Sequence, residues 1–175
     1  MVELRKGTVH KPAPFPLDRY FDNTNGNYDD LRGMEFDGPE GDVFRLVQLN
    51  KTGGFAAANK MFKYTTASTY DVEPVSGATD RVCGVGNPAL GATTTVDDNA
   101  VFFVQVEGRT QLHYGDDGNA ISAADQVGPD NDADLGKTKK NTAAYVDGVT
   151  EFTALEAAAV DGDLFDAQIK NKLIG

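Results

Sequence analysis

The chain has 175 residues and a net charge of −11, with 27 acidic against 16 basic residues. Apolar residues make up 40% of it, glycine is abundant at 19 residues and tryptophan is absent, a composition that supports one hydrophobic core with many turns. The acidic balance excludes direct nucleic-acid readout and docking on anionic lipid, because both need a concentrated basic patch.

Residues 1–41 differ from the rest and are predicted to form an extended N-terminal arm. Pro12, Pro14 and Pro16 stand at alternate positions, which excludes a helix and favours extended backbone. Disordered linkers are poor in aromatic residues, whereas large rings recur along this segment. An extended segment with such rings can lie across a partner surface; the alternative is a segment wrapped on its own domain. The predicted partner-binding anchors are Phe15, Tyr20, Phe21, Tyr28 and Phe36.

Residues 42–175 are predicted to form one compact antiparallel β-barrel or sandwich, so the expected fold class is all-β. Short apolar runs are separated by Gly, Asn, Asp or Pro, as in all-β domains. Apolar residues occupy both faces at 100–106, which places this run at the centre of the sheet. Residues 109–114 and 165–170 alternate between apolar and polar side chains, as half-buried strands do. Further strands are expected at 43–49, 60–66, 69–75 and 81–85.

Residues 152–160 (FTALEAAAV) have the propensity of a helix rather than a strand. They contain strong helix formers, and Asp-Gly pairs on both sides limit a helix to about two or three turns. A single helical turn is also compatible with residues 56–61. We therefore expect at most one or two short helices.

Neither the cysteine content nor the hydropathy predicts export or membrane insertion. Cys83 is the single cysteine and cannot form an internal disulfide. The N-terminal segment lacks the apolar core of a secretory signal, and no stretch approaches the roughly 20 apolar residues of a transmembrane helix. We expect a protein that is made in a cytoplasm and has no membrane partner.

No combination of residues predicts catalysis. A nucleophile–base pair of Cys83 and His113 lacks local support, and the strand pattern places His113 on the face of Arg109 and Gln111. With two histidines and one cysteine, a zinc-type metal site is not expected. We predict that the protein is not an enzyme, with no catalytic residue, no metal and no cofactor.

The acidic segment Asp130–Asp134 is similar to the start of a calcium loop, because acids at alternate positions can converge on one ion. Leu135 and Asn141 stand where an EF-hand has its glycine and its bidentate glutamate. A solvated acidic loop is the favoured interpretation, and weak cation binding is the alternative.

Four segments, taken in order, resemble tailed-phage capsid decoration (cement) proteins. The distinctive one is TALEAAAVDGDLFDAQI at 153–169, which is similar to the phrase that closes the β-barrel in that family. It is preceded by GGFAAANKMFKY at 53–64, VEPVSGATDRVCGVGNPAL at 72–90 and VFFVQVEGRTQL at 101–112. The resemblance covers about residues 42–169, and the proline-rich arm is not a general feature of the family.

The resemblance implies a structural virion protein on the outer face of a phage head, bound to the major capsid protein. It implies a homotrimer that clamps neighbouring capsid subunits, and we expect Phe15, Tyr20 and Phe21 to anchor in pockets of an adjacent subunit. One alternative is another virion subunit, from a tail tube or the base of a head fibre. A glycan-binding β-protein is less favoured, because sugars typically stack on aromatic residues, above all tryptophan, which is absent.

Overall fold

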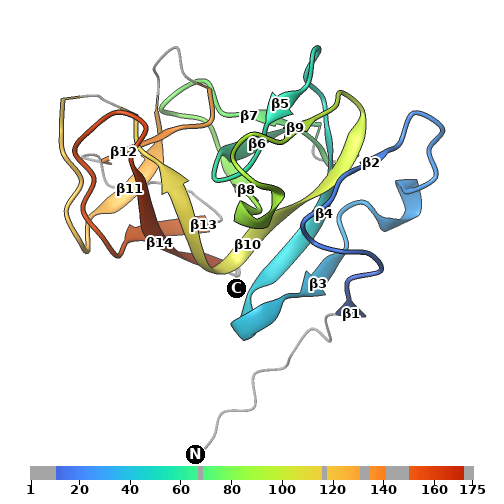
Figure 1. The fold of residues 1–175 in the computed structure, drawn as a ribbon, viewed down its shortest axis with the longest axis horizontal. Coiled ribbons are helices and arrows are strands. Elements are labelled where there is room, and N and C mark those ends of the chain that lie inside the picture. Colours follow the sequence, from blue (N-terminus) through green and yellow to red (C-terminus); the bar gives the residue numbers. More distant parts are fainter. Residues whose placement is uncertain (1–10, 67–68, 116–117, 131–134, 141–149, 172–175) are drawn as a thin grey trace, which may run out of the picture.

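The computed structural model describes residues 11–66, 69–115, 118–130, 135–140 and 150–171, which are coloured in Figure 1. These residues form a mainly β fold, which confirms the predicted class, and their helical elements are 3-10 turns at Asp29–Leu31, Pro39–Gly41 and Pro88–Leu90. The strands are β1 Lys11–Pro12, β2 Phe21–Asp22, β3 Glu35–Asp37, β4 Val43–Leu49, β5 Phe55–Ala56, β6 Met61–Thr66, β7 Asp71–Pro74, β8 Val82–Gly86, β9 Thr95–Val96, β10 Ala100–His113, β11 Gln126–Pro129, β12 Thr138–Lys140, β13 Thr150–Ala154 and β14 Leu164–Asn171.

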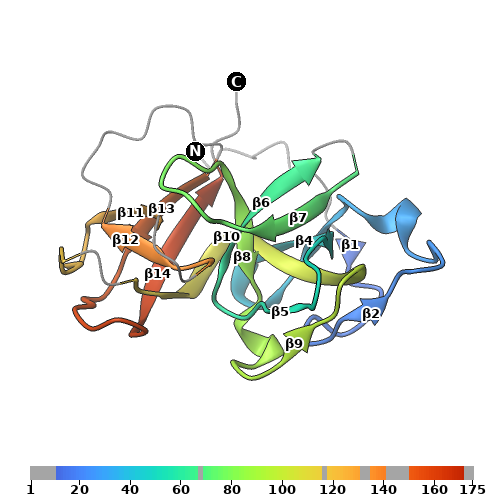
Figure 2. The same cartoon turned by 90° about the horizontal axis from the view of Figure 1, so that it is seen from above.

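The 14-residue strand β10 runs through the middle of the molecule and belongs to two closed circuits of strands (Figures 1 and 2). Its first half pairs with β4 and β8, and this circuit closes through β7 and β6. Its second half pairs with β14, and this circuit continues through β13, β11 and β12 to a bridge between Tyr114 and Thr138. We call these circuits the first barrel and the second barrel.

Residues 42–175 thus hold two small barrels where the sequence led us to expect one. The dipeptide Glu107–Gly108 is typical of a turn between two strands, so 100–106 and 109–114 were expected to be separate. The strand instead bends without reversing: Glu107 still pairs with Val43 of β4, whereas Gly108 pairs with Ile169 of β14. A register shift between Gln105 and Glu107 marks a β-bulge at this junction.

Side chains bond to the backbone on both sides of the bulge. The buried Gln105 donates from Nε2 to the carbonyl oxygens of Glu107, at 3.2 Å, and Arg109, at 2.9 Å. The Arg109 N–H donates to Oδ1 of Asp42 at 3.2 Å. Gln105 and Asp42 thus link the backbone on the two sides of the bend in β10.

We expect Gln105→Leu to lower the free energy of unfolding by about 2 kcal/mol, because it removes the two hydrogen bonds that the buried Gln105 amide donates to the backbone at the bulge. Urea unfolding followed by circular dichroism measures the effect. Gln111→Leu is the matched control, since Gln111 is exposed on the same strand, and its effect should stay within about 0.5 kcal/mol. Equal losses in the two variants would show that the bulge does not depend on Gln105.

Three groups of buried side chains form the core. One fills the first barrel and one fills the second barrel, where Met61 and Val85 of the first barrel also take part, so the two barrels pack together. The third lies on the outer face of β4 and β10. Both faces of the run 100–106 are therefore buried, as its sequence predicts: Phe102 and Val104 point into the first barrel, and Val101 and Phe103 point outward.

The outer face of β4 and β10 is covered by residues 11–37, which we call the strap. Strand β3 pairs antiparallel with β4, β1 pairs parallel with β3, and β2 pairs antiparallel with the start of β10. Half-buried apolar side chains of the strap pack on Phe44, Leu46 and Phe103. The segment is not extended throughout: strand covers only β1, β2 and β3, bends and turns lie between them, and the whole segment belongs to the same fold as the barrels.

The short helix expected at 152–160 is absent: β13 covers the first part, and a loop covers the rest. Phe152 and Ala154 are buried in the second barrel, whereas Glu151 and Thr153 are half-buried on its outside. This alternation and the pairing with β14 outweigh helix propensity. Residues 56–61 are likewise not helical. Within the described ranges, no helix is long and apolar enough to cross a membrane.

Candidate interaction surfaces

The two groups weighed as a nucleophile and its base lie in different surroundings. Cys83 of β8 is buried in the first barrel, next to Arg45 and Tyr64. Burial raises the pKa of its thiol to about 12, so the reactive thiolate is suppressed at neutral pH. His113 ends β10 and contacts the carbonyl oxygen of Gly162 through Nδ1 at 3.3 Å; burial and the nearby Lys60 lower its pKa.

We expect stability to fall at alkaline pH because of Cys83 and Tyr64. Burial raises the pKa of Cys83 from 9.0 to about 12 and that of Tyr64 from 10.0 to about 12. Above pH 9 the unfolded chain loses protons that the folded chain keeps, so the free energy of unfolding decreases as pH rises, by up to about 1.4 kcal/mol per pH unit for each group. Urea unfolding from pH 7 to 11 measures this slope, and Cys83→Ala should make it shallower from pH 9 upward. An unchanged slope would contradict the assignment to Cys83.

The described residues contain no group of three or more His, Cys, Asp or Glu side chains suited to a metal ion. Asp130 is buried, with Lys139 Nζ at 4.0 Å from its Oδ1. Asp132 and Asp134 lie outside the described residues, so the cation site considered at Asp130–Asp134 stays a prediction.

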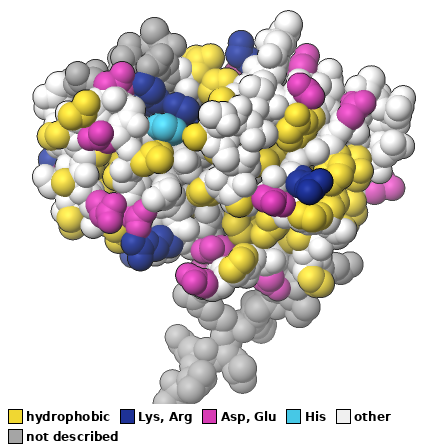
Figure 3. All heavy atoms as spheres, in the orientation of Figure 1, with side chains coloured by type: hydrophobic (Ala, Val, Ile, Leu, Met, Phe, Trp, Pro, Cys, Tyr) yellow, Lys and Arg dark blue, Asp and Glu magenta, His cyan; other side chains and the backbone are white. Residues whose placement is uncertain are grey.

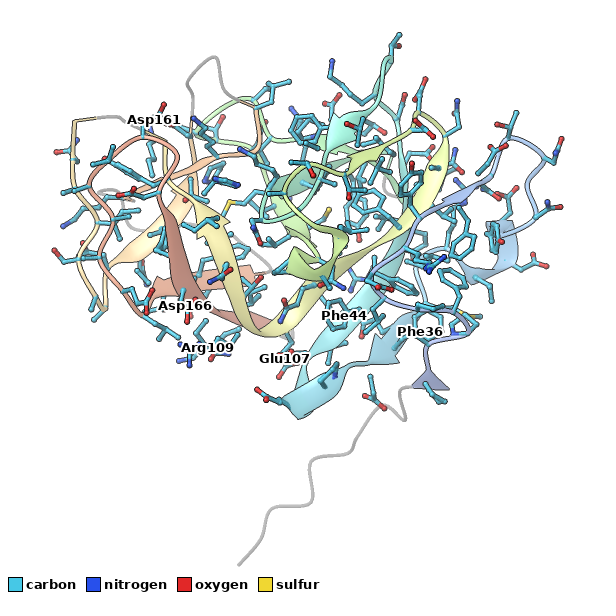
Figure 4. The ribbon with its side chains drawn as sticks, viewed as in Figure 1. Phe36, Phe44, Glu107, Arg109, Asp161 and Asp166 are labelled. Atoms are coloured by element: carbon cyan, nitrogen blue, oxygen red, sulfur yellow. The ribbon has the colours of Figure 1, made fainter. Side chains whose placement is uncertain are left out.

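Four of the five predicted anchors pack on their own chain in one aromatic group. Phe15 lies with its ring centroid 5.0 Å from Phe103, 4.6 Å from Phe21 and 5.6 Å from Tyr28. Phe36 lies 5.7 Å from Phe103 and is fully buried (Figure 4). The fifth predicted anchor, Tyr20, packs against the interior group of the first barrel.

The prediction of an arm separate from the core is therefore corrected for residues 11–41. The outward face of β10 carries Val101 and Phe103, and a face this apolar needs a cover. The strap supplies that cover within one chain, which is the alternative that the sequence left open.

Polar contacts, in addition to the aromatic rings, hold the strap on the first barrel. The Asn23 amide donates to Gln48 Oε1 at 2.6 Å, and Arg32 forms an ion pair with Asp71 at 2.8 Å. The Asn87 amide donates to the Leu17 carbonyl oxygen at 2.8 Å. Charge-assisted contacts in partly buried surroundings hold geometry well, so the strap has one defined position on the first barrel.

The outward side of the strap is itself partly apolar. Pro14 and Pro16 are exposed, and Phe15 and Leu17 between them are half-buried. Figure 3 shows a continuous group of hydrophobic side chains over this part of the molecule, on its right-hand side. The strap thus presents one apolar contact surface to solvent.

A second set of exposed apolar side chains lies on the second barrel, in residues 155–164; we call this segment the β13–β14 loop, and it includes Leu164, the first residue of β14. Among the described residues, the exposed large hydrophobic side chains are Met34, at 43%, and three from this loop. The three are Leu155 at 41%, Val160 at 65% and Leu164 at 45% exposed. Three large exposed apolar side chains within ten residues make this segment a candidate interaction site.

The β13–β14 loop is held in place by its backbone. Ala158 is buried and exchanges two hydrogen bonds with Ile121, at 2.8 and 3.1 Å. The Asp163 carboxylate accepts the Val160 N–H at 3.0 Å, and the Gly162 N–H donates to the Tyr114 carbonyl oxygen at 2.9 Å. Such a loop loses little conformational entropy when a partner binds.

The exposure of these three side chains is not predictable from the sequence pattern. Leu155 and Val160 fall in the segment 152–160, for which the sequence favours a short helix, and Leu164 carries no prediction of its own. The Asp161–Gly162 turn was visible and marks a loop, but a turn signal does not say which apolar neighbours face solvent.

No family model matches the chain, and a search of curated proteins finds no significant match.

Proposed function

We propose that the protein is a capsid decoration protein that binds the outer surface of a phage head and stabilises contacts between major capsid subunits. The observation that carries the proposal is the placing of two groups of exposed apolar side chains at opposite ends of one molecule. The strap lies on the first barrel and the β13–β14 loop on the second (Figures 1 and 2).

A clamp between neighbouring subunits needs this arrangement, because it must contact two surfaces while keeping a fixed distance between them. The shared strand β10 supplies the fixed distance. The segment with the distinctive resemblance to decoration proteins, 153–169, includes the β13–β14 loop. The non-convergent positions of Cys83 and His113 also suit a binding role better than a catalytic one.

The test uses expanded heads, stripped of decoration protein, from the phage that encodes the chain. Purified protein should sediment with these heads at a saturating ratio to the major capsid protein, and decorated heads should resist heat better than bare heads. Light scattering of the free protein should give the mass of a trimer. Heads that bind no protein would overturn the proposal, and rings or tubes of the protein alone would favour a tail-tube subunit.

A further inference from the structure

The β13–β14 loop combines exposed apolar side chains with an acidic border. The segment from Leu155 to Asp166 holds the acids Glu156, Asp161, Asp163 and Asp166 and no lysine or arginine. Glu156 and Asp161 are exposed, and Asp163 and Asp166 are half-buried. The exposed apolar side chains and four carboxylates therefore share one twelve-residue segment, and Asp163 bonds to the Val160 N–H within it.

Basic residues from neighbouring segments offset only part of this charge. Lys137 forms an ion pair with Asp161 at 2.6 Å, and Arg109 binds Asp166 (Figure 4). The lowered pKa of His113 keeps its ring neutral at pH 7, so it adds no positive charge beside Gly162. The border keeps an excess of negative charge.

We propose that the β13–β14 loop is the docking face for the major capsid protein, and that the contacting capsid surface has an apolar centre with a rim of lysine and arginine. This inference rests on the proposed function and adds to it the surface that binds and the chemistry of its partner. Burial of the three apolar side chains supplies affinity, and the acidic border selects a basic rim and speeds encounter.

Charge makes a second copy of the chain a poor occupant of the same face. Two copies meeting through this loop would bring two acidic borders together, and like charges across an interface oppose association. Each chain also carries a net charge of −11. The trimer contact is therefore expected on another surface.

The experiment measures binding of three full-length variants to stripped, expanded heads. One variant combines Leu155→Ser, Val160→Ser and Leu164→Ser. It should weaken binding at least 100-fold, because the loss of each side chain is expected to weaken binding by about 5- to 10-fold. Ala92→Ser is the control, because Ala92 is exposed and lies outside both the strap and the β13–β14 loop, and this variant should bind within 3-fold of the wild type. Glu156→Lys should weaken binding and reduce its dependence on salt between roughly 50 and 300 mM.

The outcomes separate this inference from the proposed function. Wild-type protein that binds heads while the triple variant binds equally well overturns the docking face and leaves the decoration role intact. Wild-type protein that does not bind overturns both. A triple variant that dissociates from trimer to monomer in light scattering places a second copy on the loop and also overturns the inference. If the triple variant does not fold, Val160→Lys alone decides, because its side chain is the most exposed of the three.

Discussion

Replacing Gly108 with alanine should lower the free energy of unfolding by about 3 kcal/mol. Gly108 has a φ of +109°, a conformation that residues with a Cβ rarely adopt. A Cβ at this position would also lie 1.9 Å from Asp42 Oδ1 and 3.1 Å from the Asp42 Cα. Asp42 cannot move away without losing its hydrogen bond from the Arg109 N–H, so the strain spreads into the bulge that joins the two barrels.

Gly53→Ala separates the backbone effect from the steric one. Gly53 has a φ of +84°, and a Cβ there would meet nothing within 4 Å, so this variant should lose only about 1 kcal/mol. Urea unfolding of both variants, with the slope of the transition compared to that of the wild type, gives the two values. A Gly108→Ala loss no larger than the Gly53→Ala loss would mean that Asp42 yields freely and that the junction is not tightly packed.

Deleting residues 2–34 should remove on the order of 5 kcal/mol of stability, a large share of the total for a domain of this size. The deletion uncovers the outer face of β4 and β10, where Leu46, Val101 and Phe103 are fully buried beneath the strap. Exposed β-strand faces of this kind also associate, so we expect aggregation as well as a lower urea midpoint.

Phe103→Ala tests the same contact in the full-length chain. It should cost about 4 kcal/mol, because the ring is fully buried against Phe15 and Phe36. A soluble deletion variant with the urea midpoint of the wild type, together with a mild Phe103→Ala effect, would show that the strap does not stabilise the barrels. That result would restore the idea of an arm that acts only on a partner.

The sequence predicted well the short runs that are bounded by turn residues. Residues 165–170 alternate between apolar and polar side chains, 43–49 and 100–106 are short apolar runs, and each lies in a strand of the structure. The number of barrels was not predictable in this way, because it depends on which distant segments pair. The bend at Gly108 decides it, and a Glu-Gly dipeptide is compatible with both a turn and a bulge.

That residues 11–37 cover the outer face of β10 was partly predictable from the sequence. The run AVFFVQV is apolar on both faces, so it needs two layers of cover, and the aromatic residues of 15–36 were available to supply one. Proline spacing predicts extended backbone but does not distinguish a segment that packs on its own chain from one that packs on a partner. Of the candidate docking residues, Leu155, Val160 and Leu164 were missed, because exposure follows from the route of the loop over the second barrel rather than from its composition.

The shared strand β10 also bears on how the molecule folds and unfolds. Among the described strands it alone pairs within both barrels, so loss of either half removes one wall from the corresponding barrel and leaves the bulge without support. The barrels should therefore melt in a single cooperative transition, and the amide protons of β10 should exchange with solvent only through global unfolding. A chain cut between Glu107 and Gly108 should yield two fragments that fold only when mixed.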